Sequence, residues 1–218
     1  MPQEVIKVQD LVKKYGNKDA VLRGVSFTVD KGEFVMIYGR SGCGKTTILN
    51  ILGGLDRPSS GAVIIDGVDI VDLSEDELAM LRLNKIGFVF QDYNLLMDLT
   101  VRQNVSLPLR FSKRPDDGRV DSLLKRFDIA HIANETANKI SGGEAQRAAI
   151  ARAMMNEPSV ILADEPTGNL DSENTENVLA VFESLRRDFG TTILLATHDE
   201  SLARHSSRKL LLEDGRTI

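Results

Sequence analysis

The chain has 218 residues, 42% of them hydrophobic and 27% charged, which is the balance of a globular protein with room for one large α/β domain or two small ones. Its formal net charge of -5 gives no support to a nucleic-acid-binding surface, which is usually basic, so we expect no nucleic-acid partner. Cys43 is the single cysteine, which excludes an internal disulfide, and no apolar run approaches the about 20 residues that a membrane span needs, so any membrane role is expected to come through a partner chain.

The first part of the chain predicts antiparallel strands followed by a buried strand and a helix. Apolar and polar residues alternate over residues 6–12 and again over 25–29, which is the pattern of half-buried antiparallel strands. The apolar run 34–38 predicts a buried strand, and residues 46–52 predict a helix.

A glycine-rich loop, residues 39–47 (GRSGCGKTT), joins this strand to this helix and fits the phosphate-binding pattern G-x-x-x-x-G-K-[ST]. The glycines let backbone N–H groups surround phosphates, Lys45 supplies positive charge to the β- and γ-phosphates, and the Thr46 hydroxyl suits Mg²⁺. The alternative is a glycine-rich loop with an unrelated lysine, which the flanking strand and helix disfavour. The predicted nucleotide-binding residues of the loop are Gly39, Ser41, Gly42, Cys43, Gly44, Lys45, Thr46 and Thr47.

The middle of the chain changes from strands to helices. Residues 62–70 predict a hairpin around an Asp-Gly turn, and residues 74–82 predict a helix that begins with a Ser-x-x-Glu capping box. A strand over 86–90 follows. From about 92 to 138 no strand-like run appears and residues 120–127 have helical spacing, so we expect a mainly helical subdomain inserted into the α/β core.

Residues 141–147 (SGGEAQR) begin an alanine-rich helix. Ser141 and Glu144 form a capping box, and a capped helix alone would explain both of them. It would not explain Gly142 and Gly143, because glycine is poor at a helix start unless the backbone closely approaches something. The free N–H groups suit an anion, and since one nucleotide already has its phosphates in the loop 39–47, we predict that this site reaches the nucleotide held by another copy.

Three further apolar runs, 160–163, 192–197 and 209–212, predict strands with helices between them, which indicates a largely parallel sheet covered on both faces. The first run ends at Asp164 and Glu165, at the carboxyl edge where ligands of such sheets bind. Asp164 would hold Mg²⁺, and Glu165 would activate or orient the attacking water. The alternative is a surface acidic pair that caps the next turn, and it loses weight beside a phosphate-binding loop.

In order and spacing, these segments resemble the motifs of the ATP-binding cassette subunit of ABC transporters, and the resemblance covers essentially the whole chain. Residues 39–47 resemble the Walker A loop, and Asp164 and Glu165 the Walker B acids. Ser141 to Gln146 resembles the signature motif, with Ile140 in place of the usual leucine and Glu144 where glutamine is common. The remaining assignments by resemblance are the adenine-stacking Tyr15, the Q-loop Gln91, the D-loop Asp171 within residues 168–171, and the switch histidine His198.

Several of these assignments have plain structural alternatives. Tyr15 alone would be a packing or surface aromatic, Gln91 would satisfy backbone groups at a strand end, and His198 would be a structural histidine. Residues 93–97 form a partly apolar patch, for which contact with a membrane subunit and burial inside the helical subdomain have equal weight.

The resemblance implies an α/β fold that is a P-loop NTPase core with a mainly parallel sheet, an N-terminal antiparallel β subdomain and an inserted helical subdomain. The single domain 1–218 would divide into a core with the β subdomain, 1–91 and 157–218, and a helical part, 92–156, that carries the signature motif. The implied cofactors are ATP and Mg²⁺. By resemblance the catalytic residues are Glu165, His198, Lys45 and Gln91, and the metal ligands are Thr46, Gln91 and Asp164.

The resemblance also implies partners. Two copies would close head-to-tail around two ATP molecules, with Ser141 and Gly143 of one copy on the γ-phosphate held by the other. An integral membrane permease would be a separate chain, which places the cassette peripherally at the cytoplasmic face of the cell membrane.

The sequences of residues 165–171 (EPTGNLD) and 104–109 (NVSLPL) are similar to those of the macrolide-exporter and lipoprotein-release branch. This branch couples ATP hydrolysis to export or mechanical work by a membrane subunit. Cassettes of peptide-resistance signalling and cell division have similar sequences in these segments. The rivals from other classes are a soluble ATPase of the same superfamily and a P-loop kinase. A kinase would lack Ser141-Gly142-Gly143, and the soluble types usually carry two cassettes or a long coiled coil in one chain.

Overall fold

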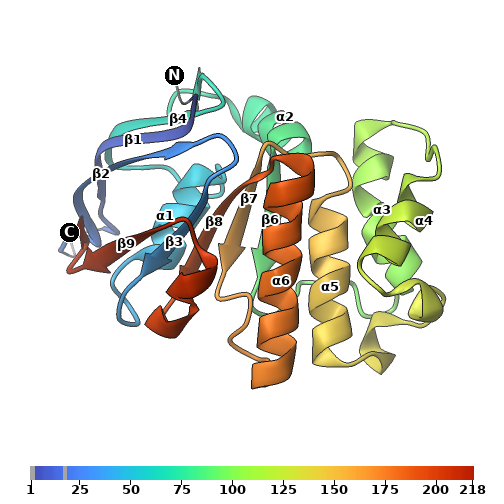
Figure 1. Cartoon of the computed structure of the whole chain (residues 1–218). Helices are drawn as coiled ribbons and strands as arrows, with labels where there is room; N and C mark the ends of the chain where they lie inside the picture. The colour runs from blue at the N-terminus through green and yellow to red at the C-terminus, as the bar shows by residue number, and fades with distance from the viewer. Residues whose placement is uncertain (1–2, 17–18) are drawn as a thin grey trace.

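The structure is a computed structural model that describes residues 3–16 and 19–218 (Figure 1). The described strands are β1 (Glu4–Lys13), β2 (Leu22–Asp30), β3 (Phe34–Tyr38), β4 (Ser60–Ile65), β5 (Val68–Asp69), β6 (Ile86–Phe90), β7 (Val160–Asp164), β8 (Thr192–Thr197), β9 (Arg208–Glu213) and β10 (Arg216–Thr217). The α-helices are α1 (Lys45–Leu52), α2 (Glu75–Lys85), α3 (Val101–Ser112), α4 (Arg119–Arg126), α5 (Gly142–Ala153) and α6 (Ser172–Phe189). Short 3-10 helices are η1 (Ala130–Ile132), η2 (Ala137–Lys139) and η3 (Glu200–His205).

The N-terminal strands form an antiparallel sheet, in the order β2-β1-β4-β5 within the described residues. Val8 of β1 lies opposite Phe27 of β2 and Val63 of β4, so the apolar positions of the alternating pattern fall in register. The turn between β4 and β5 has positive φ at both Asp66 (49°) and Gly67 (81°), as a two-residue hairpin turn requires. The predicted antiparallel strands and hairpin are confirmed.

The second sheet has the order β10-β9-β3-β8-β7-β6 in the described part of the chain, and its strands are parallel except for β10. The register aligns the strand ends, because Phe90 lies opposite Asp164, Asp164 opposite Ala196, and Tyr38 opposite Thr197. Residues that directly follow β3, β6, β7 and β8 therefore meet at one edge of the sheet. This is the edge at which ligands of open α/β sheets bind.

Both faces of this sheet are buried. Val35 and Ile37 of β3 face a core shared with α1 and the antiparallel sheet, while Phe34 and Met36 face a core shared with α3, α4, α5 and α6. Strands buried on both faces need unbroken apolar runs, which explains the sequence pattern and confirms the predicted sheet type. Figure 1 shows the antiparallel sheet at one end of the molecule and α3 and α4 at the other. The division at residues 92–156 stays a prediction, since these helices share a core with the sheet.

The helix α3 is not individually predicted by the sequence pattern. Pro108 lies inside it and lacks the N–H that a helix interior uses, which normally argues against a helix. The start of α3 is nevertheless fixed by a capping box, in which Gln103 N donates to Thr100 Oγ1 at 3.1 Å. The fully buried Asn104 ties α3 to the preceding loop, since its Oδ1 accepts from Leu96 N at 2.8 Å. Local capping and tertiary contacts therefore outweigh the proline.

Candidate functional site

The loop 39–47 and three separate strand ends meet around a cavity of about 480 Å³ at the carboxyl edge of the parallel sheet. Its lining residues are Val21, Ser41, Gly42, Gly44, Lys45, Thr46, Thr47, Gln91, Glu165 and His198. The structure thus brings together half of the residues that the sequence assigns to nucleotide binding and catalysis. They come from segments as far apart as residues 41 and 198.

The loop has the backbone of an anion site. Gly42 (φ 80°) and Gly44 (φ 110°) are in the left-handed region, which glycine adopts without strain. Gly44 caps α1 with no side-chain hydrogen bond, so the N–H groups of the first turn are free for an anion. Gly39 is required for packing, because a Cβ there would lie 2.2 Å from Leu212 O. The strand–loop–helix geometry therefore suits phosphate.

Lys45 places its positive charge inside the loop. Its ammonium group donates to Gly39 O at 2.8 Å and to Arg40 O at 3.3 Å, and its side chain is 7% exposed. Glu165 lies on the other side, with Oε1 at 3.7 Å from Lys45 Nζ. A buried ammonium flanked by carbonyl oxygens and a carboxylate is held in one orientation, ready for an anionic ligand.

Glu165 and His198 form a contact pair beside Lys45. Glu165 Oε2 lies 3.0 Å from Nδ1 of His198, whose side chain is 66% exposed. Glu165 adopts φ 45°, a left-handed conformation that is strained for a residue with a Cβ and that is often found at functional sites. This turn lets Glu165 point into the cavity instead of continuing β7. The pair has the geometry of an acid–base group and its positioning partner.

Asp164 is the buried neighbour of Glu165. Burial raises the pKa of its carboxyl group, the negative charge of Glu165 raises it further, and a hydrogen bond with the Thr46 side chain opposes both. Its Oδ1 is buried without a hydrogen-bond partner among the described residues. An unpartnered carboxylate oxygen beside a threonine hydroxyl is the hard oxygen donor set that Mg²⁺ prefers, so these residues fit a magnesium ion.

Gln91 is tied to the D-loop. Its Nε2 donates to Asn169 Oδ1 at 3.2 Å, and Asn169 Nδ2 donates back to Gln91 O at 3.2 Å. Gly168 lies against the same side chain, since a Cβ there would be 2.9 Å from Gln91 Nε2. Residues that follow β6 and β7 are thereby held to each other at the edge of the cavity.

Tyr15 does not line the cavity but contacts its surroundings. Its hydroxyl donates to Asp56 Oδ2 at 2.6 Å, and Lys13 Nζ lies 4.6 Å from the ring centroid. Burial, together with the hydrogen bond to Asp56, raises the pKa of Tyr15, and the Thr47 side chain also contacts the hydroxyl. Tyr15 is 45% exposed and lies next to the end of the loop 39–47, so part of its surface is accessible for stacking.

The segment 141–144 does not line the cavity that contains Lys45, Glu165 and His198. The capping box is present, with Ser141 N donating to Glu144 Oε2 at 2.8 Å. Both glycines also have an intramolecular reason. A Cβ at Gly142 would lie 2.9 Å from the Tyr93 hydroxyl, and one at Gly143 would lie 2.3 Å from Asn174 Oδ1. The glycines therefore do not by themselves require a ligand at this helix start.

Asp171 caps α6 and belongs to this second region. Its Oδ1 accepts from Asn174 N at 2.8 Å, and hydrogen bonds from the Asn174 backbone and side chain lower the pKa of its carboxyl group. Asn169 and Asn174, which the sequence analysis does not single out, join the D-loop to Gln91 and to Gly143, respectively. The signal that could have found them is the D-loop segment itself, which contains Asn169 and ends three residues before Asn174.

Comparison with known proteins places these features in a family. The family profile described as "ABC transporter" matches residues 22–168. A "Macrolide export ATP-binding/permease protein MacB" of Syntrophobacter fumaroxidans is 47% identical over an alignment of 220 positions, which covers 97% of this chain and 31% of that protein. The chain thus spans about a third of that relative's length. The "Lipoprotein-releasing system ATP-binding protein LolD" of Cytophaga hutchinsonii is 43% identical, with 98% of each chain covered.

A solved structure agrees over the same length. The dimeric post-hydrolysis state of the ATP-binding cassette MJ0796, bound to ADP and Pi, superimposes with a TM-score of 0.89 at 41% identity, covering 97% of this chain and 96% of that one. In residues 3–16 and 19–218, no helix is both long and apolar enough to cross a membrane.

Proposed function

We propose, from the premise that this chain belongs to the ABC transporter family, that it powers the membrane-spanning subunit of an export or lipoprotein-release system encoded as a separate chain. The chain is an ABC ATPase. The observation that carries the proposal is the meeting of Lys45, Glu165 and His198 in one cavity at the sheet edge.

The positions of the site residues support a role for each of them. We assign the β- and γ-phosphates of ATP to the backbone N–H groups of residues 39–47 and to Lys45. Glu165 orients the attacking water, and His198, in contact with Glu165, faces the γ-phosphate. Tyr15 stacks on the adenine with its exposed ring face.

Magnesium belongs to the same proposal. Thr46, Asp164 and Gln91 are the residues that would hold it, Asp164 through the oxygen that has no protein partner. When bound, the ion neutralises charge on the phosphates that leave and transfer. The protein itself supplies these oxygen donors and holds Lys45 and Glu165 next to each other in the same cavity.

We further propose that two copies act together in a head-to-tail dimer. Residues 141–144 and Asp171 lie at the starts of α5 and α6, outside the cavity of their own chain. In a head-to-tail dimer they would face the nucleotide held by the second copy. The free N–H groups at the start of α5 support this, because a helix N-terminus stabilises an anion. The dimeric MJ0796 cassette bound to ADP and Pi is consistent with it.

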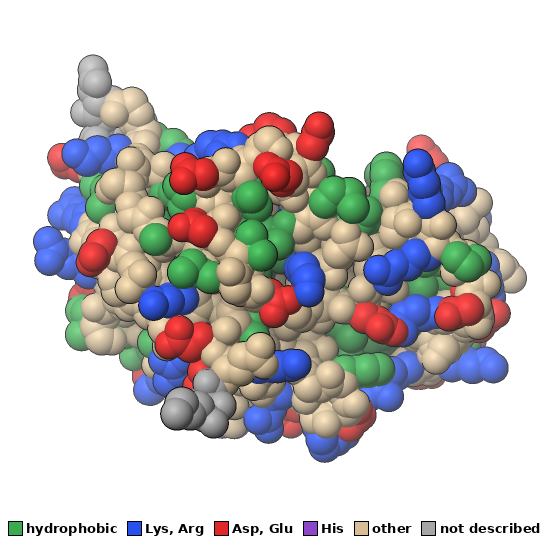
Figure 2. Space-filling model, turned by 90° about the horizontal axis from the view of Figure 1, so that it is seen from above, with side chains coloured by type: hydrophobic (Ala, Val, Ile, Leu, Met, Phe, Trp, Pro, Cys, Tyr) green, Lys and Arg blue, Asp and Glu red, His purple; other side chains and the backbone are tan. Residues whose placement is uncertain are grey.

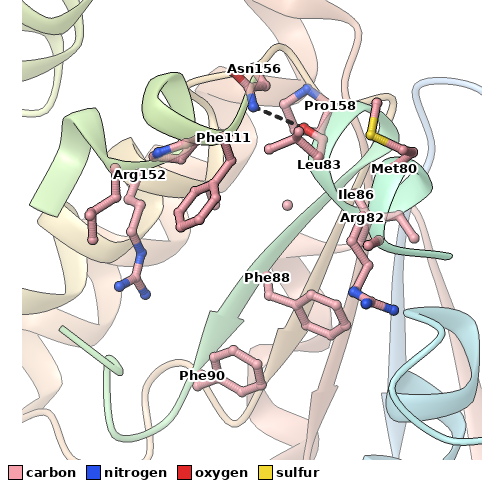
Figure 3. A pocket seen from close by; sticks show the side chains of 15 residues that line it. Met80, Arg82, Leu83, Ile86, Phe88, Phe90, Phe111, Arg152, Asn156 and Pro158 are labelled. Atoms are coloured by element: carbon pink, nitrogen blue, oxygen red, sulfur yellow. Dashed lines mark hydrogen bonds between the residues drawn. The ribbon is translucent and has the colours of Figure 1, made fainter. Parts of the chain in front are cut away.

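The surface proposed for the membrane subunit is a groove of about 530 Å³ between α2, β6, α3 and α5 (Figure 3). Phe111 points from α3 toward Phe88 and Phe90 of β6. Phe111 is 71% exposed and Met80, on the opposite wall, is 57% exposed. Figure 2 shows exposed hydrophobic side chains among dispersed charges, and a notch between the part with α3 and α4 and the rest. Apolar surface of this kind marks a protein contact.

The groove adjoins the catalytic cavity. Phe90 lines the groove and the next residue, Gln91, lines the cavity, so a segment seated in the groove sits one residue from the nucleotide site. The patch 93–97 is partly buried in the helical subdomain and partly available for contact with a membrane subunit. Leu95 is buried, whereas Leu96 and Met97 are about half exposed. This supports a contact surface that is continuous around the end of β6.

The test is a pull-down from solubilised native membranes with the Glu165→Gln variant in Mg-ATP. We expect recovery of a membrane protein with few spans and a large extracytoplasmic region. Adding Phe111→Ser should abolish the recovery, whereas Phe189→Ser, which changes another exposed phenylalanine outside the groove, should not. Recovery of only soluble partners, or of ribosomes, would support the alternative of a soluble ABC-type ATPase. Recovery of a sensor kinase or a cell-division protein would support signalling or division.

A further inference from the structure

The turn that follows Gln91 has an unfavourable backbone. Tyr93 and Asn94 have φ values of 60° and 49°, so two successive residues with side chains are in the left-handed region. A single asparagine tolerates this conformation, but a tyrosine next to it does not adopt it readily. Such a pair persists only where the surrounding structure holds it.

Arg152, in the last turn of α5, is the side chain that holds this turn. Its Nη1 donates to Asn94 O at 2.5 Å and its Nη2 donates to Tyr93 O at 2.9 Å. Among the described residues no carboxylate lies within ion-pair distance of this guanidinium, and its burial lowers its pKa. A partly buried guanidinium that uses its planar fork on two consecutive carbonyl oxygens is a specific clamp that an ammonium group cannot reproduce.

The other end of the turn is held by the D-loop. Asn169 Nδ2 donates to Gln91 O and to Asp92 Oδ1, each at 3.2 Å. Gln91 is therefore fixed between β6, Asn169 and the clamped turn. A change in the turn at residues 93–94 would change the direction in which the Gln91 side chain leaves the strand.

We propose that Arg152 is a positioning residue for ATP hydrolysis, which fixes the turn after Gln91 to α5 so that the Gln91 side chain reaches the nucleotide cavity in one orientation. The inference rests on the role proposed above for Gln91. It adds a connection between the two halves of the composite site, because Ser141 caps the start of α5 and Arg152 lies in its last turn. A shift of the Ser141 end is transmitted along a rigid helix of about 18 Å to the turn that carries Gln91.

The test compares Arg152→Lys with a matched control, Arg119→Lys. Arg119 also donates to two consecutive carbonyls near the end of α5, Met155 O at 2.8 Å and Met154 O at 3.0 Å, but it does not contact the turn. Arg152→Lys should lower kcat by about 10- to 100-fold with the KM for ATP changed less than about two-fold, as expected for a small misplacement. Arg119→Lys should keep kcat, and both variants should have similar melting temperatures.

A double-mutant cycle with Gln91→Ala separates this inference from the proposed function. If Arg152 acts through Gln91, Arg152→Lys should cause no further loss of kcat in the Gln91→Ala background. Full additivity would overturn the inference while leaving the role of Gln91 intact. A normal kcat for Gln91→Ala alone would overturn both.

A second variant tests directly whether Arg152 acts through the strained turn. Glycine adopts positive φ without strain, so Asn94→Gly reduces the backbone strain that Arg152 must offset at this turn. In the Arg152→Lys background, Asn94→Gly should recover a measurable part of kcat. No recovery in a well-folded double variant would show that the strained turn is not what Arg152 controls.

Discussion

Two neighbouring acids at the end of β7 illustrate how burial divides function between residues. Asp164 is turned inward, where burial raises its pKa and one oxygen lacks a partner. Glu165 leaves the strand through a strained turn and contacts Lys45 and His198. A buried, unpartnered carboxylate costs stability, and it persists at sites where a ligand completes it.

We therefore expect Asp164→Asn to stabilise the nucleotide-free protein while it impairs magnesium use. At pH 7 the melting temperature should rise by about 2–4 °C for each kcal/mol of removed desolvation cost. The apparent affinity for Mg²⁺ in the ATPase assay should fall about 10- to 100-fold. Both are measured on the same preparation, by thermal unfolding without nucleotide and by turnover against Mg²⁺ concentration.

The same residue gives a pH dependence of defined sign. The pKa of Asp164 is higher in the folded than in the unfolded state, so the folded protein binds more protons between the two values. Stability from this group is present below the unfolded pKa and is lost as pH rises through the folded pKa. The advantage of Asp164→Asn over the wild type should shrink as the pH is lowered. An advantage that is constant with pH, or a lower melting temperature at pH 7, would contradict this account.

At the scale of elements, the two capping boxes at the starts of α2 and α5 are nearly identical. Ser74 N and Ser141 N each donate to the glutamate three residues on, at 2.8 Å in both cases. As structure they are equivalent, and only the box at α5 lies in the segment that we propose contacts the nucleotide of another copy. The pair therefore allows capping to be separated from ligand binding.

We expect Ser74→Ala and Ser141→Ala to lower the free energy of unfolding by a similar amount, about 1 kcal/mol each. Only Ser141→Ala should also reduce ATP turnover, by about 10-fold or more, because the lost hydroxyl and the perturbed helix start would face the γ-phosphate held by the other copy. Urea unfolding and steady-state ATPase assays measure the two effects. Equal ATP turnover in the two variants would show that Ser141 only caps α5 and does not act on the nucleotide.

The sequence predicts elements well where local pattern and tertiary environment agree. The apolar runs of β3, β7 and β8 are buried on both faces, so the pattern alone predicts them and the residues that follow them. It does not predict α3, whose Pro108 is tolerated because of the cap and of Asn104. Nor does it predict what Gly142 and Gly143 approach, or the Arg152 clamp, because such contacts join segments far apart in the chain.

At the scale of the whole molecule, the described chain places its phosphate-binding loop and the start of α5 in separate regions. The cavity holds Lys45 and Glu165, whereas residues 141–144 lie outside it. If both contact the same ATP, that ATP must join two copies, and the nucleotide becomes part of the interface. Dimerisation should then depend on bound ATP and be undone by hydrolysis.

The Glu165→Gln variant should therefore trap a dimer. The substitution keeps the size of the side chain but removes the carboxylate that orients water, so turnover should fall about 10²- to 10⁴-fold while ATP still binds. Light scattering after size exclusion should give the mass of two copies in Mg-ATP and of one copy in ADP.

Glu135→Gln, a change at an exposed glutamate, should hydrolyse ATP normally and not accumulate as a dimer. Adding Ser141→Ala to Glu165→Gln should weaken the dimer, and adding Ser74→Ala should not. A mass of one copy at saturating ATP would exclude the shared-nucleotide interface, because no other described contact would then bring residues 141–144 to a phosphate.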